Sequence, residues 1–323
     1  MKARVRVLAA AMVCGWLSIA TSAQQGVSRF PMPFEPIGNA NEAIFPAFEG
    51  WGASQDGASY LVVLGYMNRN RTQTVEIPIG PNNKIEPGGP DFGQPTVFEP
   101  GRQTTIFAIK VPKDFGSQKL TWTLVANGQP AVVTFYLNRE YNMNFYKEES
   151  NGNEPPKMKL AANDPLIAGP AAGVSQTLTA TVGQPVPLTM WASDKPPTEK
   201  NWESIISAGR RQAQAVPPSQ VAIIDGRMIG GPGGRGKSED SVKATPDIVA
   251  VWTKVRGPGV VTVAPAKVPM VTDGKPDTVV EAHATATFSA PGEYVLRAEP
   301  VEADDGFDGL CCFTFANVKV IVK

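Results

Sequence analysis

This sequence of 323 residues has very few histidines and cysteines, and its net charge is zero. It contains one histidine and three cysteines, and its 30 basic residues balance 30 acidic ones. Without an excess of positive charge, the chain lacks the basic surface with which proteins bind nucleic acid or anionic lipid. The single histidine, His283, and the lack of a Gly-x-Ser-x-Gly sequence also argue against a Ser-His-Asp hydrolase.

The cysteines are too few for a disulfide-rich scaffold. Cys14 lies in an apolar N-terminal run, and the other two, Cys311 and Cys312, are neighbours. A disulfide between neighbours requires a distorted turn, because successive strand residues face opposite sides. Two free thiols, a strained vicinal disulfide and a bond to another chain are all open, and we favour the first two. Zinc binding by this pair with His283 is disfavoured because the ligand spacing is wrong.

Long runs of helix-forming residues are also missing, whereas 31 glycines and 30 prolines supply many turns. Short β-branched segments between such turns predict an all-β chain. The length predicts two domains. We therefore expect two β-sandwich domains.

The N-terminus has the features of a secretory signal. Lys2, Arg4 and Arg6 precede an apolar run over residues 7–20, which ends in the small residues Thr21-Ser22-Ala23. This order predicts a signal peptide over residues 1–23. A membrane anchor is the alternative, but the run is shorter than the ~20 residues that span a bilayer. We expect a secreted, periplasmic or cell-surface protein without a membrane span.

The first domain is predicted over residues 46–139, after an extended lead-in at 24–45. Asn127-Gly128 is a favoured hairpin turn, and the polar residues 68–71 predict a second hairpin. Residues 140–172 have the composition of a linker. The expected strands of this domain cover residues 60–66, 72–79, 104–111, 120–126 and 131–137.

The second sandwich is predicted over residues 173–323. A polar segment rich in proline and glycine interrupts it at 195–246, which we interpret as an insertion forming a long loop or a short helix at 201–214. Long loops on a rigid sandwich are frequent recognition sites. The expected strands cover residues 177–182, 185–191, 248–252, 260–263, 284–288, 293–297 and 318–322.

Two segments of the second domain carry a family resemblance. Residues 251–259 read Val-Trp-Thr-Lys-Val-Arg-Gly-Pro-Gly, and residues 286–297 read Ala-Thr-Phe-Ser-Ala-Pro-Gly-Glu-Tyr-Val-Leu-Arg. With the acidic turn at 303–306, they resemble PKD-like domains, although the 195–246 insertion and the pair Cys311-Cys312 depart from that pattern. The resemblance implies an immunoglobulin-like sandwich that serves as a spacer, adhesive or binding module. The N-terminal half, with Trp51 and Trp122, resembles uncharacterised secreted bacterial proteins, which implies no activity.

One segment fits the P-loop pattern G-x-x-x-x-G-K-S. It covers Gly231–Ser238. A working P-loop follows a strand directly and begins a helix at its Lys-Ser. Here Asp225-Gly226-Arg227 intervenes before it, and Glu239, Asp240 and Pro246 follow. We therefore interpret it as a glycine-rich loop.

The acidic turn at 299–308 is a candidate metal site. Its clustered carboxylates, with no basic residue between them, are suitable hard-oxygen ligands for calcium. The predicted ligands are Asp304, Asp305 and Asp308, with Glu299 and Glu302 nearby. The alternative is a solvated polar loop with a turn-capping aspartate. Calcium is the one cofactor that the sequence suggests.

Aromatic residues are the remaining candidates for binding. Most lie in expected strands and should pack in the core, whereas Trp51 and Phe92, in turn-rich stretches, are the exceptions that could stack on sugars. The favoured interpretation is a non-enzymatic binding or adhesion-type module whose partner is a protein or glycan at the cell surface. A structural spacer or assembly subunit of the cell envelope is the alternative. A secreted hydrolase with paired carboxylates comes third.

Overall fold

Apolar alternation and frequent turns give an all-β chain, which confirms the predicted fold class. The structure is a computed structural model, and it describes residues 38–148, 152–195, 222–224, 227–229, 248–272, 275–302 and 313–323. These ranges contain no α-helix, only the 3-10 turns η1 (Lys113–Phe115) and η2 (Arg139–Tyr141). No helix in the described part of the chain is long and apolar enough to cross a membrane.

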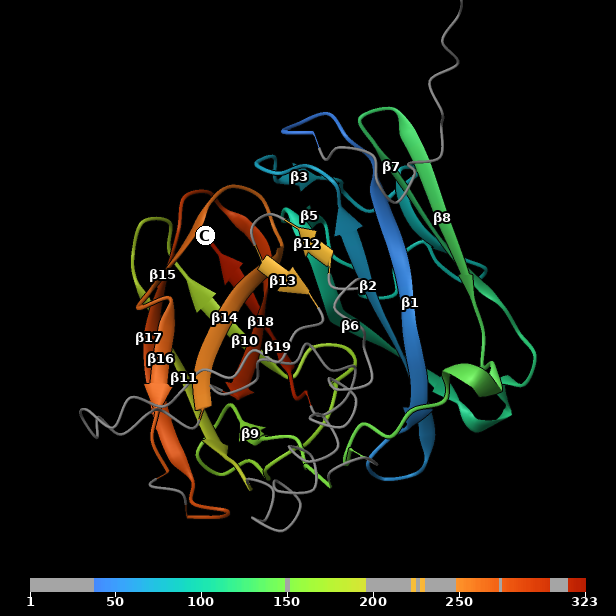
Figure 1. The fold of residues 1–323 in the computed structure, drawn as a ribbon. Coiled ribbons are helices and arrows are strands. Elements are labelled where there is room, and N and C mark those ends of the chain that lie inside the picture. The colour runs from blue at the N-terminus through green and yellow to red at the C-terminus, as the bar shows by residue number, and fades with distance from the viewer. Residues whose placement is uncertain are drawn as a thin grey trace, which may run out of the picture. The chain divides into compact units, whose positions relative to one another are not determined.

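The N-terminal sandwich consists of two three-stranded sheets and one short strand pair (Figure 1). Its core includes Leu64 and Phe107 of one sheet and Trp122 and Phe135 of the other. The first sheet contains β1 (Ile44–Ala53), β2 (Ser59–Asn68) and β6 (Gly101–Pro112), the second contains β4 (Asn83–Glu86), β7 (Leu120–Ala126) and β8 (Gln129–Phe135), and the short pair is β3 (Val75–Glu76) with β5 (Val97–Phe98).

The C-terminal sandwich packs a five-stranded sheet on a four-stranded one, and a separate hairpin comes from the 195–246 segment. The larger sheet has the order β10 (Gln176–Ala180), β19 (Ala316–Val322), β18 (Gly292–Glu302), β14 (Ile248–Arg256), β16 (Lys267–Met270). The smaller sheet has the order β15 (Val261–Ala264), β17 (Val280–Phe288), β11 (Val186–Ser193), β9 (Lys157–Lys159), and the hairpin is β12 (Ala222–Ile224) with β13 (Arg227–Ile229).

The second sandwich is immunoglobulin-like. Strands β9, β11 and β17 stand in the order A-B-E, and strands β14, β18 and β19 in the order C-F-G, of that fold. Tyr294, near the start of β18, donates its hydroxyl to the carbonyl of Ala290 at 2.8 Å, as in the tyrosine corner of immunoglobulin domains. Its ring also lies against Gly257. The two segments that carry the family resemblance therefore contact each other.

One predicted hairpin is confirmed and one is wrong. Asn127 and Gly128 join β7 to β8 with φ values of 51° and 75°, as a two-residue hairpin turn requires. The polar residues 68–71, in contrast, do not form a hairpin turn, because β2 already pairs with β1 on one edge and β6 on the other. Strand β3 pairs with β5 instead.

Strand β2 is apolar on both faces because both faces are covered. Val62 and Leu64 face the core of the N-terminal sandwich, whereas Leu61 and Val63 pack against Phe145 on the other side. Phe145 belongs to the segment 140–172 that the sequence assigns to a linker. The same segment supplies β9, an edge strand of the second sandwich.

Candidate functional site

Several predicted site residues lie outside the described part of the chain. These are the calcium ligands Asp304, Asp305 and Asp308, the cysteines Cys311 and Cys312, and Gly231–Ser238. Of the flanking acids, Glu299 pairs with Arg297 at 2.8 Å, and Glu302 accepts hydrogen bonds from the side-chain amide of Asn153. The calcium site therefore stays a prediction.

His283 is a solvent-exposed side chain of the second sandwich. It lies on the outer face of β17, its side chain is 68% exposed, and its nearest polar partners, Thr189 and Glu281, are 3.5 Å away. Within the ranges that the structure describes, no three histidine, cysteine or acidic residues converge as metal ligands would. Burial alternates along β17, and this alternation turns His283 towards solvent.

Aromatic rings gather at one end of the N-terminal sandwich. Phe48 of β1 lies 5.0 Å from Tyr141 and 5.9 Å from Phe135, measured between ring centroids. Trp51 of β1 meets Tyr60 of β2 edge to face at 5.1 Å. We call the following residues the aromatic cluster: Phe48, Trp51, Tyr60, Phe135 and Tyr141, together with Tyr136, which follows Phe135 in the chain and is turned outward.

The backbone fixes this cluster firmly. The indole Nε1 of Trp51 donates to the carbonyl of Asn138 at 2.6 Å. The amide of Met143 donates to the carbonyl of Trp51 at 2.9 Å. Because Asn138 precedes η2, these bonds tie the turn that carries Tyr141 to strand β1.

Two rings of the aromatic cluster are exposed. Tyr136 is 37% and Tyr141 is 48% exposed, whereas Phe135 is buried. Exposed large apolar rings beside a packed core are a feature of binding surfaces. The cluster is therefore the candidate functional site.

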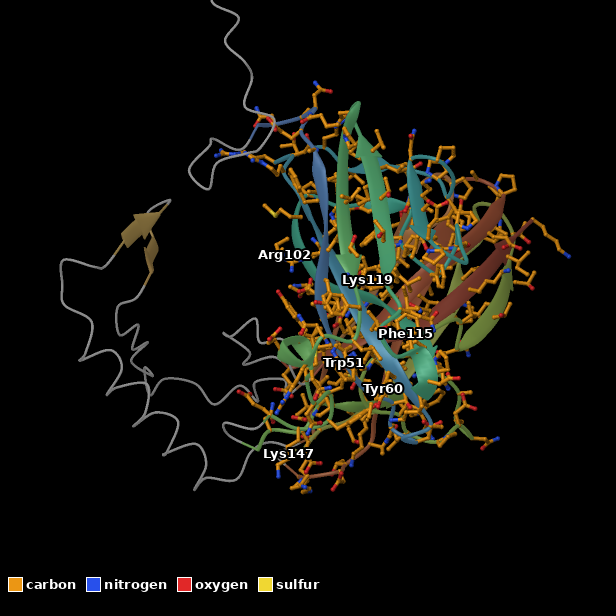
Figure 2. The ribbon with its side chains drawn as sticks, turned by 90° about the vertical axis from the view of Figure 1, so that its right-hand side faces the viewer. Trp51, Tyr60, Arg102, Phe115, Lys119 and Lys147 are labelled. Atoms are coloured by element: carbon orange, nitrogen blue, oxygen red, sulfur yellow. The ribbon has the colours of Figure 1, made fainter. Side chains whose placement is uncertain are left out.

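Lysine side chains lie over the tyrosine rings. The Nζ of Lys113 is 3.9 Å from the ring centroid of Tyr60, and that of Lys119 is 5.2 Å from that of Tyr136. Ammonium groups over an aromatic face are attracted by the ring quadrupole. Figure 2 shows Trp51, Tyr60 and Lys119 on the face of the sandwich turned to the viewer.

A buried ion pair lies on the opposite face of strand β1. Glu49, at the β-bulge of that strand, accepts a bond from Arg102 at 2.5 Å, and its side chain is only 4% exposed. Burial raises the pKa of Glu49, and the hydrogen bond from Arg102 counteracts part of that rise. A side chain at Gly65 would collide with this pair. The pair therefore holds β1, β2 and β6 together and is not free for chemistry.

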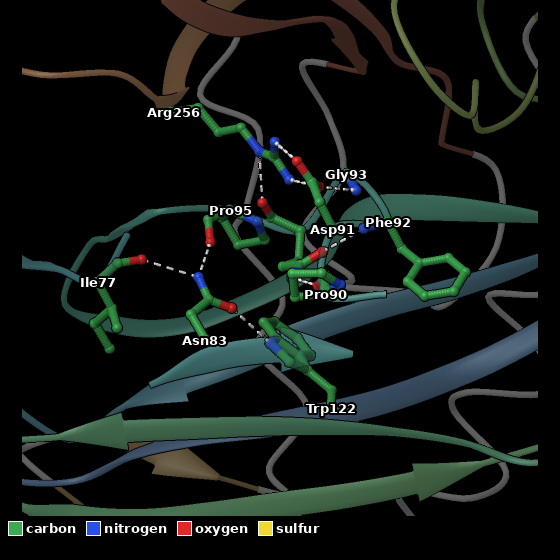
Figure 3. Close-up of polar contacts among 10 residues, drawn as sticks. Ile77, Asn83, Pro90, Asp91, Phe92, Gly93, Pro95, Trp122 and Arg256 are labelled. Atoms are coloured by element: carbon green, nitrogen blue, oxygen red, sulfur yellow. Dashed lines mark hydrogen bonds and ion pairs between the residues drawn. The ribbon is translucent and has the colours of Figure 1, made fainter. Parts of the chain in front are cut away.

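A second polar network joins the two sandwiches (Figure 3). Arg256 at the end of β14 contacts both carboxylate oxygens of Asp91 at 2.6 and 3.0 Å, and its Nε donates to the carbonyl of Gln94 at 2.6 Å. Behind this loop, the buried amide of Asn83 accepts from the Trp122 indole at 3.0 Å. Hydrogen bonds from Arg256 lower the pKa of Asp91.

Apolar contacts accompany this network. Val255 and Val295 of the second sandwich pack against the core of the first, and Phe313 meets Phe145 at 6.0 Å between centroids. A small, mostly apolar hollow lies beside them, with Phe107 and Asn317 in its wall. This hollow lies at the interface between the two sandwiches. Few polar groups point into it, whereas a ligand site usually has several that converge.

Sequence reasoning found part of this site. Core packing is confirmed for most strand aromatics, such as Trp122. Trp51 and Phe92, expected as the exposed rings, are half-buried and pack against the N-terminal core. Tyr136 and Tyr141 are exposed instead. Strict alternation from Ala131 through Phe135 in β8 already turns Tyr136 outward, and this signal could have identified it.

The comparisons with known proteins provide no relative from which a function could be carried over. No family model and no curated protein matches the chain. The D00-D0 domain of Intimin is 11% identical with a TM-score of 0.25, covering 87% of this chain and 100% of its own. The D0-D1 domain of Intimin is 10% identical with a TM-score of 0.23, covering 86% and 97%. Scores this low carry no argument, so the fold assignment depends on the strand pairing itself.

Proposed function

We propose that this protein is a non-enzymatic extracytoplasmic module that binds a glycan through the aromatic cluster. The observation that carries the proposal is the exposure of Tyr141, which packs against Phe48 on a turn that the Trp51–Asn138 hydrogen bond ties to β1, with the exposed Tyr136 directly after β8. Rigid rings lose little conformational entropy on binding, and this makes tyrosine a frequent anchor of binding surfaces.

The chemistry of the surroundings suits a sugar. Aromatic faces pack against the C–H groups of a pyranose ring, while neighbouring polar groups bond its hydroxyls. Asn138 and Asn142 flank Tyr141 in the chain, and Asn142 is exposed. Asn138 Oδ1 accepts a hydrogen bond from the amide of Glu140 at 3.3 Å, and Asn142 Nδ2 donates to the carbonyl of Trp51 at 3.4 Å, so these amides also hold the turn beside the rings.

The second sandwich has a supporting role in this proposal. Its two motif segments resemble PKD-like domains and contact each other through Tyr294 and Gly257. Such sandwiches space and present neighbouring domains outside the cell, and the predicted signal peptide agrees with that location.

A structural spacer is the second candidate, and the joint between the sandwiches favours it. Arg256, Val255 and Phe313 connect the second sandwich to the first by an ion pair and apolar packing. A spacer of this kind holds its two domains at a fixed angle and needs no ligand at the aromatic cluster.

Binding by the mature chain, residues 24–323, tests the two candidates. We expect the mature chain to migrate more slowly in a native gel that contains a soluble polysaccharide than in a gel without it. Tyr136→Ala with Tyr141→Ala should weaken binding by roughly tenfold or more, since buried tyrosine anchors contribute at this scale. The matched control, Tyr136→Phe with Tyr141→Phe, keeps both rings and should bind within a few-fold of the parent.

Thermal unfolding of both double variants confirms that they fold. Equal binding by the alanine and phenylalanine variants would overturn the assignment of the aromatic cluster. A chain that binds no polysaccharide and associates with itself would support the spacer.

A further inference from the structure

Lysine ammonium groups lie beside the aromatic cluster. Residues 110–149, which include the turn that carries Tyr141, contain five basic and four acidic residues. The five basic residues are all exposed: Lys110, Lys113, Lys119, Arg139 and Lys147. Lys113 and Lys119 lie over rings of the cluster, and Arg139 is two residues before Tyr141.

Within the part of the chain that the structure describes, several basic residues have no ion-pair partner, Lys267 and Lys323 among them, and the five cations near the aromatic cluster belong to this group. At the joint between the sandwiches and within the first sheet, the opposite holds, since Arg256 pairs with Asp91, Lys254 with Glu76, and Arg102 with Glu49.

Unpaired cations beside exposed rings favour one class of sugar. To a neutral sugar, an ammonium group offers only a hydrogen-bond donor, which an uncharged hydroxyl group would also provide. A carboxylate on the same sugar gains a charge-assisted hydrogen bond, which is stronger than a neutral one. A sugar that packs against Tyr136 lies within reach of Lys119, whose Nζ is 5.2 Å from the centroid of that ring. The ammonium group of Lys113 covers the half-buried ring of Tyr60 and offers a second positive charge beside the cluster.

We infer that the ligand is an acidic polysaccharide whose carboxylates contact Lys113 and Lys119 while its rings pack on the tyrosines. The inference rests on the proposed function, because it assigns the substrate class of the same site.

Polygalacturonate and its fully methyl-esterified form make a matched pair of probes, since esterification removes the charge and keeps the backbone. We expect the mature chain to bind polygalacturonate at least tenfold more tightly at low salt. The preference should shrink at 1 M salt, where the screening length falls to about 3 Å.

Lys113→Gln with Lys119→Gln should lower affinity for the acidic polymer by roughly three- to tenfold and leave the ester unchanged, the scale expected for exposed charge pairs. The control, Lys267→Gln with Lys323→Gln, removes the same charge far along the chain from the site and should keep the preference. An equal loss in both double variants would show adsorption to net charge and overturn the inference.

The failures of the two proposals are distinguishable. Binding of both polymers with equal affinity, lost in the Tyr136→Ala, Tyr141→Ala variant, would retain the glycan site and refute its acidic preference. If neither polymer binds and neutral polysaccharides such as dextran also fail to bind, the proposed function itself is refuted.

Discussion

Arg256 holds both carboxylate oxygens of Asp91 across the boundary between the two sandwiches, at 2.6 and 3.0 Å. Bidentate guanidinium–carboxylate pairs are geometrically specific as well as charged. The backbone beside them agrees with this contact, because the amide of Thr96 donates to the carbonyl of Val255 at 2.9 Å. The joint is therefore built from side-chain and main-chain bonds together, and this makes a fixed angle between the sandwiches the physical expectation.

The strength of this ion pair can be measured by a double-mutant cycle. We expect a coupling energy on the order of 1 kcal/mol between Arg256→Gln and Asp91→Asn, since the Asp91 side chain is 49% exposed and solvent screens the pair. Urea unfolding of the parent, both single variants and the double variant gives the value. Strict additivity of the two single effects would show that the pair contributes nothing to stability.

The ion pair of Arg256 with Asp91 should make the free energy of unfolding depend on pH. Hydrogen bonds from Arg256 hold the pKa of Asp91 below its usual 3.8 in the folded chain. A lowered folded pKa stabilises the protein above the unfolded value, and this stabilisation disappears as the pH falls through the folded pKa. The difference in unfolding free energy between parent and Arg256→Gln should thus be constant from pH 7 to about 5 and shrink below pH 4.

Asp91→Asn is the control for that pH dependence, because an amide does not titrate. In the Asp91→Asn background, Arg256→Gln should have the same effect at pH 7 and pH 3. If the difference in unfolding free energy between the parent and Arg256→Gln is as large at pH 3 as at pH 7, the effect of Arg256 comes from its hydrogen bond to Gln94 instead.

Gly257 should tolerate no side chain. A Cβ there would lie 2.4 Å from the ring of Tyr294, and its φ of 118° is unfavourable for other residues. Gly183 is the matched control, because its φ is also positive and nothing lies within 4 Å of its Cβ. We expect Gly183→Ala to cost about 1 kcal/mol from the backbone alone, and Gly257→Ala about 1–3 kcal/mol more from overpacking. Equal losses in denaturant unfolding would show that the ring of Tyr294 moves aside at no cost.

Local signals predicted the fold best. Asn127-Gly128 encodes its own positive φ values, so the β7–β8 hairpin could be inferred from two letters. The pairing of β2 with β6 could not be inferred in this way, because the paired residues lie from 33 (Asn68 and Gly101) to 53 (Ser59 and Pro112) positions apart and no tight turn connects the two strands. Strand β1 was missed for a related reason, since its proline, glycines and bulge obscure the alternation.

The candidate site was less predictable than the fold. Trp51 has a turn-rich neighbourhood in sequence, yet its indole bonds Asn138, which lies 87 residues further along the chain. Conversely, Tyr141 looks like an ordinary residue of a polar segment, yet the turn η2 places its ring against Phe48 of β1 while 48% of the residue stays exposed. Whether an aromatic ring is exposed depends on contacts between residues that are far apart in the sequence, and the local composition does not reveal these contacts.

Calcium binding by the acidic turn is the last prediction. Its ligands, Asp304, Asp305 and Asp308, follow β18 directly, and the neighbouring Glu302 is already bonded to Asn153. Because a ligand that binds only the native state stabilises it by mass action, calcium at about 100 times its Kd should add about 2.7 kcal/mol to the unfolding free energy. Thermal unfolding with millimolar calcium and with chelator measures the shift of the midpoint.

Two variants decide whether that shift belongs to the acidic turn. Asp304→Ala with Asp305→Ala should abolish it, since hard-oxygen ligands hold calcium by charge and number. Asp114→Ala with Glu140→Ala removes the same charge from the N-terminal sandwich and should leave it intact. If both double variants lose the calcium-dependent shift equally, the shift reflects general screening of the acidic surface. If the parent chain itself does not respond to calcium, residues 303–308 are a solvated turn, and the aromatic cluster is the only ligand site that remains proposed for the chain.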